Sequence, residues 1–343
     1  MAGRMKFSLL DHYGIEFTRG HDVKADDSER LLDAFIAEEN VDLIANVLRA
    51  WNQKGITEDE LHGFATIMRR RMKPVDPHGL ECVDIVGTGG SKVKTFNVST
   101  AAAFVVAGAG IPVAKHGNRA ATSSSGSADV LTTLGIAVDV EPEQAERDLA
   151  GFGICFMFAP RHHSLSPRLA TARRSLGEPT IFNCVGPLCN PAGAPFQLIG
   201  VFDEKLRMIM ANVLSRLGTK HSWIVNNIGS LDEIGLKGVT RVVDVDADGV
   251  RTVEVTAADF GIDDEGDIPM DLSALESASL IIDLLDNSAV GSAAERLVLM
   301  NAAAAINVTG RSRDLKEAYS VAEGSIRSGA AFDKLAALRE SRK

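Results

Sequence analysis

The chain has 343 residues, of which 45% are hydrophobic and 24% are charged, and its formal net charge is −10 at pH 7. This is the composition of a globular protein with enough residues for two domains, and no low-complexity tract or short repeat predicts disorder. The negative charge argues against non-specific binding to nucleic acid or to anionic membranes, so an anionic ligand would require a local cluster of donors.

The sequence favours a cytoplasmic location. Its first residues, MAGRMKFSLLDHYGIEF, contain no apolar signal-peptide core, and its longest apolar run, residues 101–114, is too short and too marked by Gly and Pro to span a bilayer. None of the cysteines forms a C-x-x-C pair, which suits buried thiols in a reducing compartment rather than zinc ligands or disulfides. The cysteines are Cys82, Cys155, Cys184 and Cys189.

Helical periodicity marks the first part of the chain. Apolar residues recur on one helical face in residues 43–51 and again in residues 61–68. Thr57, followed three residues later by Glu60, forms a capping box that marks the start of the second helix. We therefore predict a small helical domain over residues 1–75.

From Cys82 onward, short apolar strands alternate with helices. The strands are CVDIV, PVAK, ICFMF, QLIGVF and SWIVNN. This alternation is typical of a parallel α/β sheet flanked by helices. We predict an α/β fold in which a larger domain over residues 76–343 holds a mostly parallel central sheet. The helical segment 166–178 has no strand of its own, and we expect it to join the small domain.

The stretch GTGGSKVKTFNVST, residues 87–100, follows the first strand. It fits neither G-x-G-x-x-G nor the P-loop pattern, because Lys92 stands where each pattern needs a glycine. A glycine turn at the carboxyl end of a strand, followed by polar residues that open a helix, still presents backbone N–H groups that suit a pyrophosphate. For these glycines alone, a plain tight turn before a capped helix is the alternative interpretation.

A second loop of the same kind, KHGNRAATSSSGSAD, covers residues 115–129 and also lies between a strand and a helix. Two adjacent strands that end in such loops predict a single cleft. Lys115 would supply one charge for a phosphate and Arg119 a second, while Ser123 and Ser127 offer hydroxyl donors. A serine-rich stretch by itself is more typical of a solvated loop.

Motifs on these loops and beyond them occur together and in order. They are GTGG at 87–90, TFNVST at 95–100, KHGNR at 115–119, SGSADVL at 125–131, FNCVGPLCNP at 182–191, and the acids Asp232 and Glu233. Through these motifs the chain resembles, over about residues 84–310, the anthranilate phosphoribosyltransferases of tryptophan biosynthesis, which are relatives of the pyrimidine nucleoside phosphorylases. The resemblance implies transfer of phosphoribose from phosphoribosyl pyrophosphate (PRPP) to the amine of anthranilate, giving N-(5-phosphoribosyl)anthranilate and pyrophosphate.

The resemblance also implies roles for the residues at matching positions. Those expected to bind the substrates are Gly87, Thr88, Gly89, Gly90, Ser91, Thr95, Asn97, Val98, Ser99, Thr100, Lys115, His116, Gly117, Asn118, Arg119, Ser123, Ser127, His163 and Arg173. Those expected to take part in catalysis are Lys115, Arg173, Asn118 and His116. Those expected to hold a Mg²⁺ cofactor are Ser99, Asp232 and Glu233. Anthranilate itself would contact Asn118 and Arg173.

The chemistry of these residues supports the implied roles. Two adjacent acids after the strand SWIVNN are hard oxygen ligands that suit a hydrated Mg²⁺, although such a pair alone would also fit a solvated turn or a helix cap. An aromatic amine is already a neutral nucleophile, so no strong base is required. Mg²⁺, Lys115 and the loop amides would stabilise the departing pyrophosphate. Single histidines are more often structural than catalytic, so we expect His116 and His163 to shape the acceptor pocket.

Three arginines lie in the helical segment SPRLATARRSLG. Because a helix turns about 100° per residue, only one of them can face the cleft squarely. The spacing of ten residues from His163, which is that of the family, points to Arg173, whose planar fork would pair with the acceptor carboxylate. We expect Arg174 to be exposed and leave Arg168 open.

The chain departs from the family pattern at three places. Ser91 and Lys92 stand where the family usually has Asp-Gly, residues 164–166 (Ser-Leu-Ser) stand where it often has Pro-Ala-Met, and Pro179 replaces the usual Arg. The last two departures lie on the acceptor side, so the acceptor is less firmly specified than the phosphoribosyl site.

Alternatives therefore remain open: a phosphoribosyltransferase with another aromatic acceptor, a nucleoside phosphorylase, or a non-catalytic relative that binds PRPP or nucleic acid. The acids Asp232 and Glu233, together with Arg173, argue against the phosphorylase, and the negative charge argues against nucleic acid. As partners we expect PRPP and anthranilate, without nucleic acid or a membrane. We also expect a homodimer formed through the helical domain, as in the family, although that domain is short here.

Overall fold

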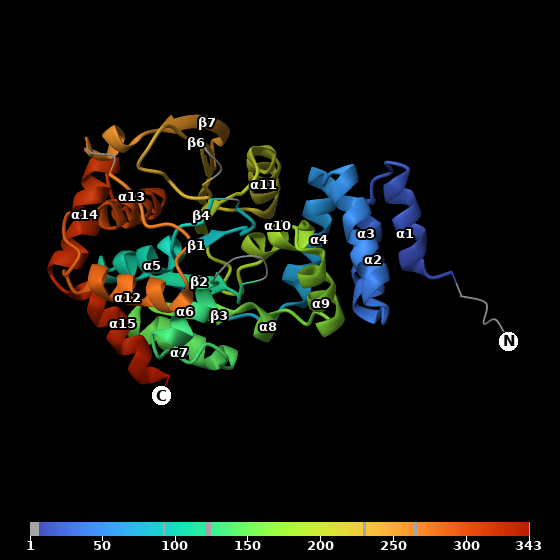
Figure 1. Cartoon of the computed structure of the whole chain (residues 1–343), viewed down its shortest axis with the longest axis horizontal. Helices are drawn as coiled ribbons and strands as arrows, with labels where there is room; N and C mark the ends of the chain where they lie inside the picture. Colours follow the sequence, from blue (N-terminus) through green and yellow to red (C-terminus); the bar gives the residue numbers. More distant parts are fainter. Residues whose placement is uncertain (1–6, 92, 121–124, 229–230, 264–265, 343) are drawn as a thin grey trace.

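The computed structural model describes residues 7–91, 93–120, 125–228, 231–263 and 266–342. Its first helices are α1 (Leu9–Thr18), α2 (Ser28–Ala37), α3 (Val41–Lys54) and α4 (Glu58–Arg71). Figure 1 shows α1 to α3 at one end of the long axis of the molecule and the C-terminal helices at the other.

The N-terminal helices pack around the buried ring of Trp51. Phe17 stacks on this ring with 4.7 Å between centroids, and Phe64 lies edge-on to it at 5.2 Å. The capping box expected at the start of α4 is confirmed, because Thr57 Oγ1 accepts from the Glu60 N–H at 3.3 Å and Glu60 accepts from the Thr57 N–H at 3.0 Å. The buried Glu60 carboxylate also accepts from the Trp51 indole N–H at 3.0 Å, which fixes the start of α4 to the core.

A seven-stranded sheet forms the centre of the molecule. Its strands are β1 (Val83–Gly87), β2 (Val113–Gly117), β3 (Ile154–Phe158), β4 (Phe196–Gly200), β5 (His221–Asn227), β6 (Thr240–Asp246) and β7 (Gly249–Val255). Their order in space is β3-β2-β1-β4-β5-β6-β7, in which β1 to β5 run parallel while β6 and β7 form an antiparallel extension. This mostly parallel sheet confirms the predicted fold class, whereas the β6–β7 extension was not expected from the sequence.

β1 lies where the chain changes direction across the sheet. From β1 the chain continues to β2 and β3 on one side, and it then returns to β4 and β5 on the other. The last residue of β1, Gly87, is paired with the last residue of β4, Gly200. Open α/β sheets bind ligands outside the carboxyl ends of their strands at such a switch point. The loop after β1 therefore starts where a ligand is expected.

The remaining helices cover both faces of the sheet, except for α9, which packs on α2 and α3. They are α5 (Val98–Gly108), α6 (Ser127–Thr133), α7 (Pro142–Phe152), α8 (Ala159–His162), α9 (Pro167–Leu176), α10 (Ile181–Leu188), α11 (Glu204–Leu217), α12 (Ala274–Leu285), α13 (Ala293–Val308), α14 (Leu315–Arg327) and α15 (Ala330–Ser341). One core packs α5, α6 and α12 to α15 on the sheet, a second packs α1 to α4 and α9 to α11, and a third, smaller core lies between α7 and β3. Leu198 enters the first core and Ile199 the second, as the two-residue period of β4 requires.

The segment 166–178 contains α9, which contacts α2 and α3. In the next helix, the ring of Phe182 lies edge-on to Phe35 at 6.0 Å and to Phe64 at 6.1 Å. The contacts of α9 with α2 and α3 support the prediction that 166–178 joins the helical domain, and those of Phe182 show that the start of α10 packs there as well. The division into residues 1–75 and 76–343 stays a prediction.

Two other features concern the chain as a whole. In the described ranges, no helix combines the length and the apolar character needed to cross a membrane. The four cysteines are buried free thiols, as expected.

Candidate active site

A pocket of about 520 Å³ lies at the carboxyl ends of the parallel strands. The predicted site residues that line it are Gly87, Thr88, Gly89, Gly90, Ser91, Thr95, Asn97, Ser99, Lys115, His116, Gly117, Asn118, Arg119, Ser127, His163, Arg173, Asp232 and Glu233. Val98 and Thr100 do not line it, because both side chains are buried where the first turn of α5 meets the core. Ser123 and Lys92 lie outside the described residues.

The first loop is held against the end of β4. The backbone N–H of Thr88 donates to the Gly200 carbonyl at 2.9 Å, and the Phe202 N–H donates to Thr88 Oγ1 at 3.2 Å. Gly90 has a φ of +81°, and a Cβ at this position would lie 2.4 Å from Cγ of Pro179. Only glycine satisfies both conditions. Pro179, one of the departures from the family pattern, therefore contacts the first loop directly.

The second loop is joined to the first and closed on itself. Ser125 Oγ donates to Asn97 Oδ1 at 2.8 Å, which connects the second loop to the residue before α5. Asp129 accepts from the backbone N–H groups of Ala120 and Gly126 at 2.9 and 3.0 Å. It also lies 3.1 Å from a guanidinium nitrogen of Arg119. The second cation expected for phosphate therefore already has one carboxylate partner.

Lys115 is buried at the base of the pocket. Its Nζ donates to the Ile85 carbonyl and, at 3.3 Å, to Ser99 Oγ. Burial lowers the pKa of Lys115, while Asp84 and then Glu233 raise it. Burial raises the pKa of Asp84 to about 6, and the charge of Lys115 lowers it. Lys115 therefore interacts with two acids that favour its charged form.

Asp232 and Glu233 face the same pocket. A Cβ at Gly200 would lie 1.8 Å from the Asp232 carbonyl oxygen, so only glycine lets this segment approach the end of β4. Burial raises the pKa of Asp232 to about 6, and a hydrogen bond from the Ser91 hydroxyl lowers it. Burial, and then the charge of Asp232, raise the pKa of Glu233 well above its usual value. With the Ser99 hydroxyl nearby, these hard oxygen atoms fit a divalent cation such as Mg²⁺, whose charge would favour the ionised form of both acids.

Two histidine rings lie together on the side of the pocket where the acceptor is expected. The centroids of His116 and His163 lie 5.1 Å apart. Burial lowers the pKa of His163 to about 4, and burial followed by the charge of His163 lowers that of His116 well below its usual value. Both rings are therefore neutral near pH 7. The Gly186 carbonyl, 3.2 Å from Nδ1 of His116, can only accept, so Nδ1 carries the proton and Nε2 is left as an acceptor.

Arg173 is the arginine of α9 that lines the pocket. Its guanidinium lies 5.4 Å from the Phe182 ring centroid and donates to Asn183 Oδ1 at 3.4 Å. Burial lowers its pKa to about 10, so the group remains charged at pH 7. Among the described residues it forms no ion pair, and its Nε has no hydrogen-bond partner. Arg174 is exposed, and Arg168 lies 3.3 Å from Glu39. Arg173 thus presents a positive charge to the pocket.

The pocket is also lined by residues for which the sequence predicted no role. Leu165 and Ser166, which belong to the second departure, line the pocket, and Ser166 caps α9 by accepting from the Arg168 N–H at 3.2 Å. Asn183 and residues 185–187 of α10 line it as well. The signal for them was the motif FNCVGPLCNP, which supported the family resemblance without suggesting what its side chains contact.

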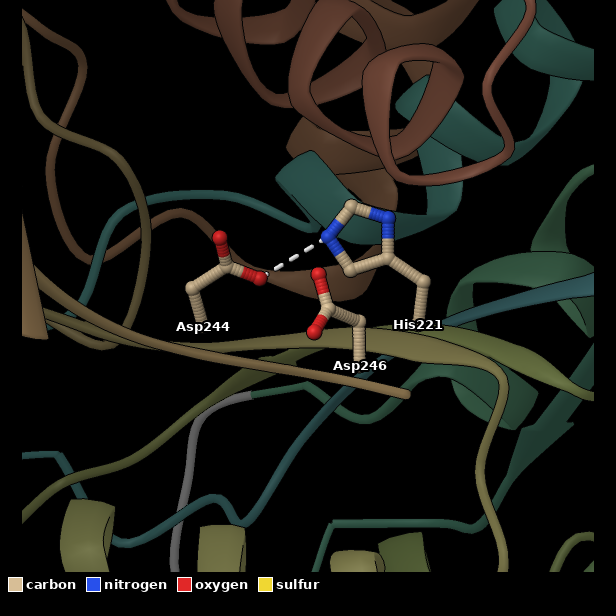
Figure 2. Close-up of side chains that lie close together, drawn as sticks. All are labelled: His221, Asp244 and Asp246. Carbon is tan, nitrogen blue, oxygen red and sulfur yellow. Dashed lines mark hydrogen bonds and ion pairs between the residues drawn. The ribbon is translucent and has the colours of Figure 1, made fainter. Parts of the chain in front are cut away.

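A different cluster lies at the opposite end of the parallel strands from the pocket, where β5 begins. Figure 2 shows His221, Asp244 and Asp246 on the same side of strands β5 and β6, with ligand atoms within 4.8 Å of one another. Nε2 of His221 lies 2.8 Å from Asp244, and Arg251 lies 2.8 Å from Asp244 and 2.6 Å from Asp246. The guanidinium already pairs with both carboxylates, so we assign no metal to this cluster.

Comparisons with known proteins agree with the geometry of the pocket. Residues 79–332 match the family described as "Glycosyl transferase family, a/b domain". The chain is 39% identical over 328 residues to the anthranilate phosphoribosyltransferase of Halalkalibacterium halodurans, covering 95% of this chain and 96% of the relative. It is 42% identical over 325 residues to that of Myxococcus xanthus, covering 93% and 95%.

Solved structures of anthranilate phosphoribosyltransferases are also similar to this chain over nearly its whole length. The anthranilate phosphoribosyltransferase of Thermus thermophilus matches with a TM-score of 0.84 at 32% identity, covering 96% of this chain and 98% of that one. The enzyme from Saccharomyces cerevisiae, solved in complex with PRPP and Mg, matches with a TM-score of 0.86 at 26% identity, covering 97% of each chain.

Proposed function

The chain belongs to the anthranilate phosphoribosyltransferase family, and we propose that it transfers phosphoribose from PRPP to anthranilate in tryptophan biosynthesis. The products are N-(5-phosphoribosyl)anthranilate and pyrophosphate. The observation that carries this proposal is the convergence, in one pocket, of two strand-end loops, an acid pair and a buried guanidinium that has no carboxylate partner among the described residues.

PRPP binds between the two loops. The glycine turn at residues 87–90 and the first turn of α5 offer backbone N–H groups, and the positive end of the α5 dipole lies at the same place. Lys115 adds a charge at the base of the pocket, and Asn97, Ser99 and Ser127 add side-chain donors. Because the overall charge of the chain is negative, these local donors provide the attraction for a pyrophosphate.

Mg²⁺ binds with PRPP at Ser99, Asp232 and Glu233. When bound, the cation neutralises charge on the pyrophosphate and on the acid pair. Burial raises the pKa of both acids, and the charge of Asp232 raises that of Glu233 further, so a bound divalent cation would favour the ionised form of both carboxylates.

Anthranilate binds on the side of α9 and α10. Its carboxylate pairs with the Arg173 fork, Asn118 contacts it from the second loop, and its ring lies against the neutral His116 and His163. The amine can donate a hydrogen bond to Nε2 of His116. This bond directs the nitrogen lone pair away from the histidine wall and toward the ribose.

The reaction then requires positioning rather than a strong base. The amine nitrogen forms a bond to the anomeric carbon of the ribose as the bond from that carbon to pyrophosphate breaks. Pyrophosphate takes the electron pair, and the proton that the nitrogen loses passes to water. Lys115 and the loop amides stabilise the negative charge that develops on the leaving group, and Arg173 holds the acceptor in line.

An assay of PRPP consumption with and without anthranilate tests the proposal. We expect consumption that depends on anthranilate and releases one pyrophosphate per turnover. Pro179 and residues 164–166 depart from the family pattern beside the acceptor, so other aromatic amines should be compared in parallel. Preference for an uncharged aromatic amine would point to a different acceptor class. Phosphorolysis of a pyrimidine nucleoside without PRPP turnover would point to a phosphorylase.

We further propose that the enzyme is a cytoplasmic homodimer that associates through the helical domain. Three apolar side chains on or beside α1 support this surface: Phe7 is 67% exposed, Leu9 37% and Ile15 42%. Light scattering after size-exclusion chromatography should give twice the monomer mass. Replacing Phe7 and Ile15 by Glu should lower that mass, and an unchanged mass would place the interface elsewhere.

A further inference from the structure

We infer that Asn183 is a positioning residue that links the acceptor-binding Arg173 to the PRPP-binding first loop. The inference rests on the proposed function, since it deepens the account of the same pocket. Asn183 lies in the first turn of α10, within the motif FNCVGPLCNP. Its side chain faces the pocket between the two halves of the site.

Both the oxygen and the nitrogen of the Asn183 side-chain amide form hydrogen bonds. Its Oδ1 accepts from the Thr180 backbone N–H at 3.0 Å, which closes the capping box of α10. The same oxygen accepts from Arg173 Nη2 at 3.4 Å. Its Nδ2 donates to the Thr88 carbonyl at 3.0 Å. One planar group therefore contacts the helix start, the guanidinium and the glycine loop.

Capping alone does not explain an amide at this position. The other capping boxes of the described residues carry an acid at the equivalent position: Asp11, Glu60, Asp129, Asp259 and Glu276. An acid is also the better choice for a cap, because a negative charge in the first turn is favoured by the helix dipole. The box at α10 has a neutral amide, so another requirement acts on this residue.

That requirement is visible in the surroundings of Arg173. An acid beside the guanidinium would form an ion pair with it and compete with the carboxylate of the substrate. The amide oxygen of Asn183 orients Arg173 without cancelling its charge. The amide nitrogen has no part in capping, and its bond to Thr88 is possible only for an amide, because a carboxylate cannot donate.

The link to Thr88 connects the acceptor side to the switch point of the sheet. Thr88 is bonded to the end of β4 through Gly200, so its carbonyl has a fixed position. Asn183 in turn has a fixed position, because the neighbouring Phe182 is packed in the core. The guanidinium of Arg173 is therefore held at a set distance from the loop that binds PRPP, as transfer between two substrates requires.

The variant Asn183→Asp tests this inference most sharply. It keeps the capping oxygen, removes the donor to Thr88 and places a charge beside Arg173. We expect the KM for anthranilate to rise about 10-fold or more, as for a lost charge-assisted hydrogen bond, while the KM for PRPP rises less. The melting temperature should fall only modestly, because the capping oxygen is kept although the Thr88 carbonyl loses its donor.

Two further variants separate positioning from a general structural effect. Asn183→Ala removes both links without adding charge, so it should raise the anthranilate KM less than Asn183→Asp does. Asn52→Ala is the matched control, because Asn52 Nδ2 donates to the Pro179 carbonyl of the same segment at 2.7 Å but does not contact Arg173. We expect the control to leave the anthranilate KM within about twofold of wild type.

The outcomes distinguish this inference from the proposed function. A wild-type enzyme that does not turn over anthranilate would contradict the function itself. If wild type turns over anthranilate and folded Asn183→Asp has a KM within about twofold of it, the positioning role is wrong. Equal effects of Asn183→Asp and Asn52→Ala on the anthranilate KM would also overturn it. The position of the segment that holds Pro179 and Asn183 would then explain the change in KM without a role for the Asn183 amide.

Discussion

Replacing Arg173 by Lys tests whether the guanidinium of this residue binds the carboxylate of anthranilate. In the structure the guanidinium lies over Phe182 and donates one hydrogen bond to Asn183, and its Nε has no partner among the described residues. At least two N–H groups therefore remain for a substrate carboxylate. A lysine keeps the charge but offers a single point contact instead of a fork.

The expected magnitude follows from that difference. Loss of one hydrogen bond between charged groups costs about 1.5–3 kcal/mol. Since about 1.4 kcal/mol corresponds to a factor of ten, the KM for anthranilate should rise roughly 10- to 150-fold in Arg173→Lys. The KM for PRPP should change little, because among the described residues the hydrogen bond of Arg173 goes to Asn183 and not to a residue of either loop.

Arg174→Lys is the matched control. Arg174 is exposed and donates to Thr171 Oγ1 at 3.2 Å, so its replacement should leave both KM values unchanged. Steady-state kinetics that follow the fluorescence of anthranilate at saturating PRPP measure the effect. Equal behaviour of the two variants would refute the carboxylate clamp, as would a rise confined to the KM for PRPP.

Three other predictions concern the donor site, the cation and pH. Lys115→Ala should weaken PRPP binding by about 1.5–3 kcal/mol in calorimetry, and unchanged affinity would contradict its role. The double variant Asp232→Asn, Glu233→Gln should lose activity at limiting Mg²⁺, and wild-type turnover there would show that the cation binds elsewhere. Burial lowers the pKa of His163 from 6.5 to about 4, so the stability that the neutral ring provides is complete above pH 6.5 and is lost as the pH falls toward 4. Between pH 7 and about pH 4.5, urea unfolding should show wild type losing roughly 2 kcal/mol more than His163→Asn, whereas parallel losses would mean that the ring is not buried in its neutral form.

Local patterns in the sequence were sufficient to predict the parallel sheet and both loops that follow its strands. Short apolar runs and glycine turns act over a few residues, so they can be read without knowing the fold. The β6–β7 extension was missed because its strand TRVVDVD alternates with charged residues, unlike the apolar parallel strands. Its assignment depends on pairing with β5, which the sequence does not display.

The other differences at the site depend on how side chains are arranged in three dimensions, which the sequence does not display. Arg119 was expected to supply a second cation for phosphate, and nothing in the sequence indicated that Asp129 lies 3.1 Å from its guanidinium. Val98 belongs to a motif that borders the pocket, but its own side chain points into the core because successive residues of a helix face different directions. Asn183 was unassigned because its partners Arg173 and Thr88 come from separate parts of the chain.

The central claim is that one pocket holds PRPP and anthranilate side by side, and crystal structures of the enzyme with PRPP and Mg²⁺ and with anthranilate test it most directly. The account predicts the pyrophosphate between residues 87–91 and 115–119, and the anthranilate carboxylate within hydrogen-bond distance of Arg173. Pyrophosphate bound away from the two loops, or an anthranilate whose carboxylate points away from Arg173, would contradict it.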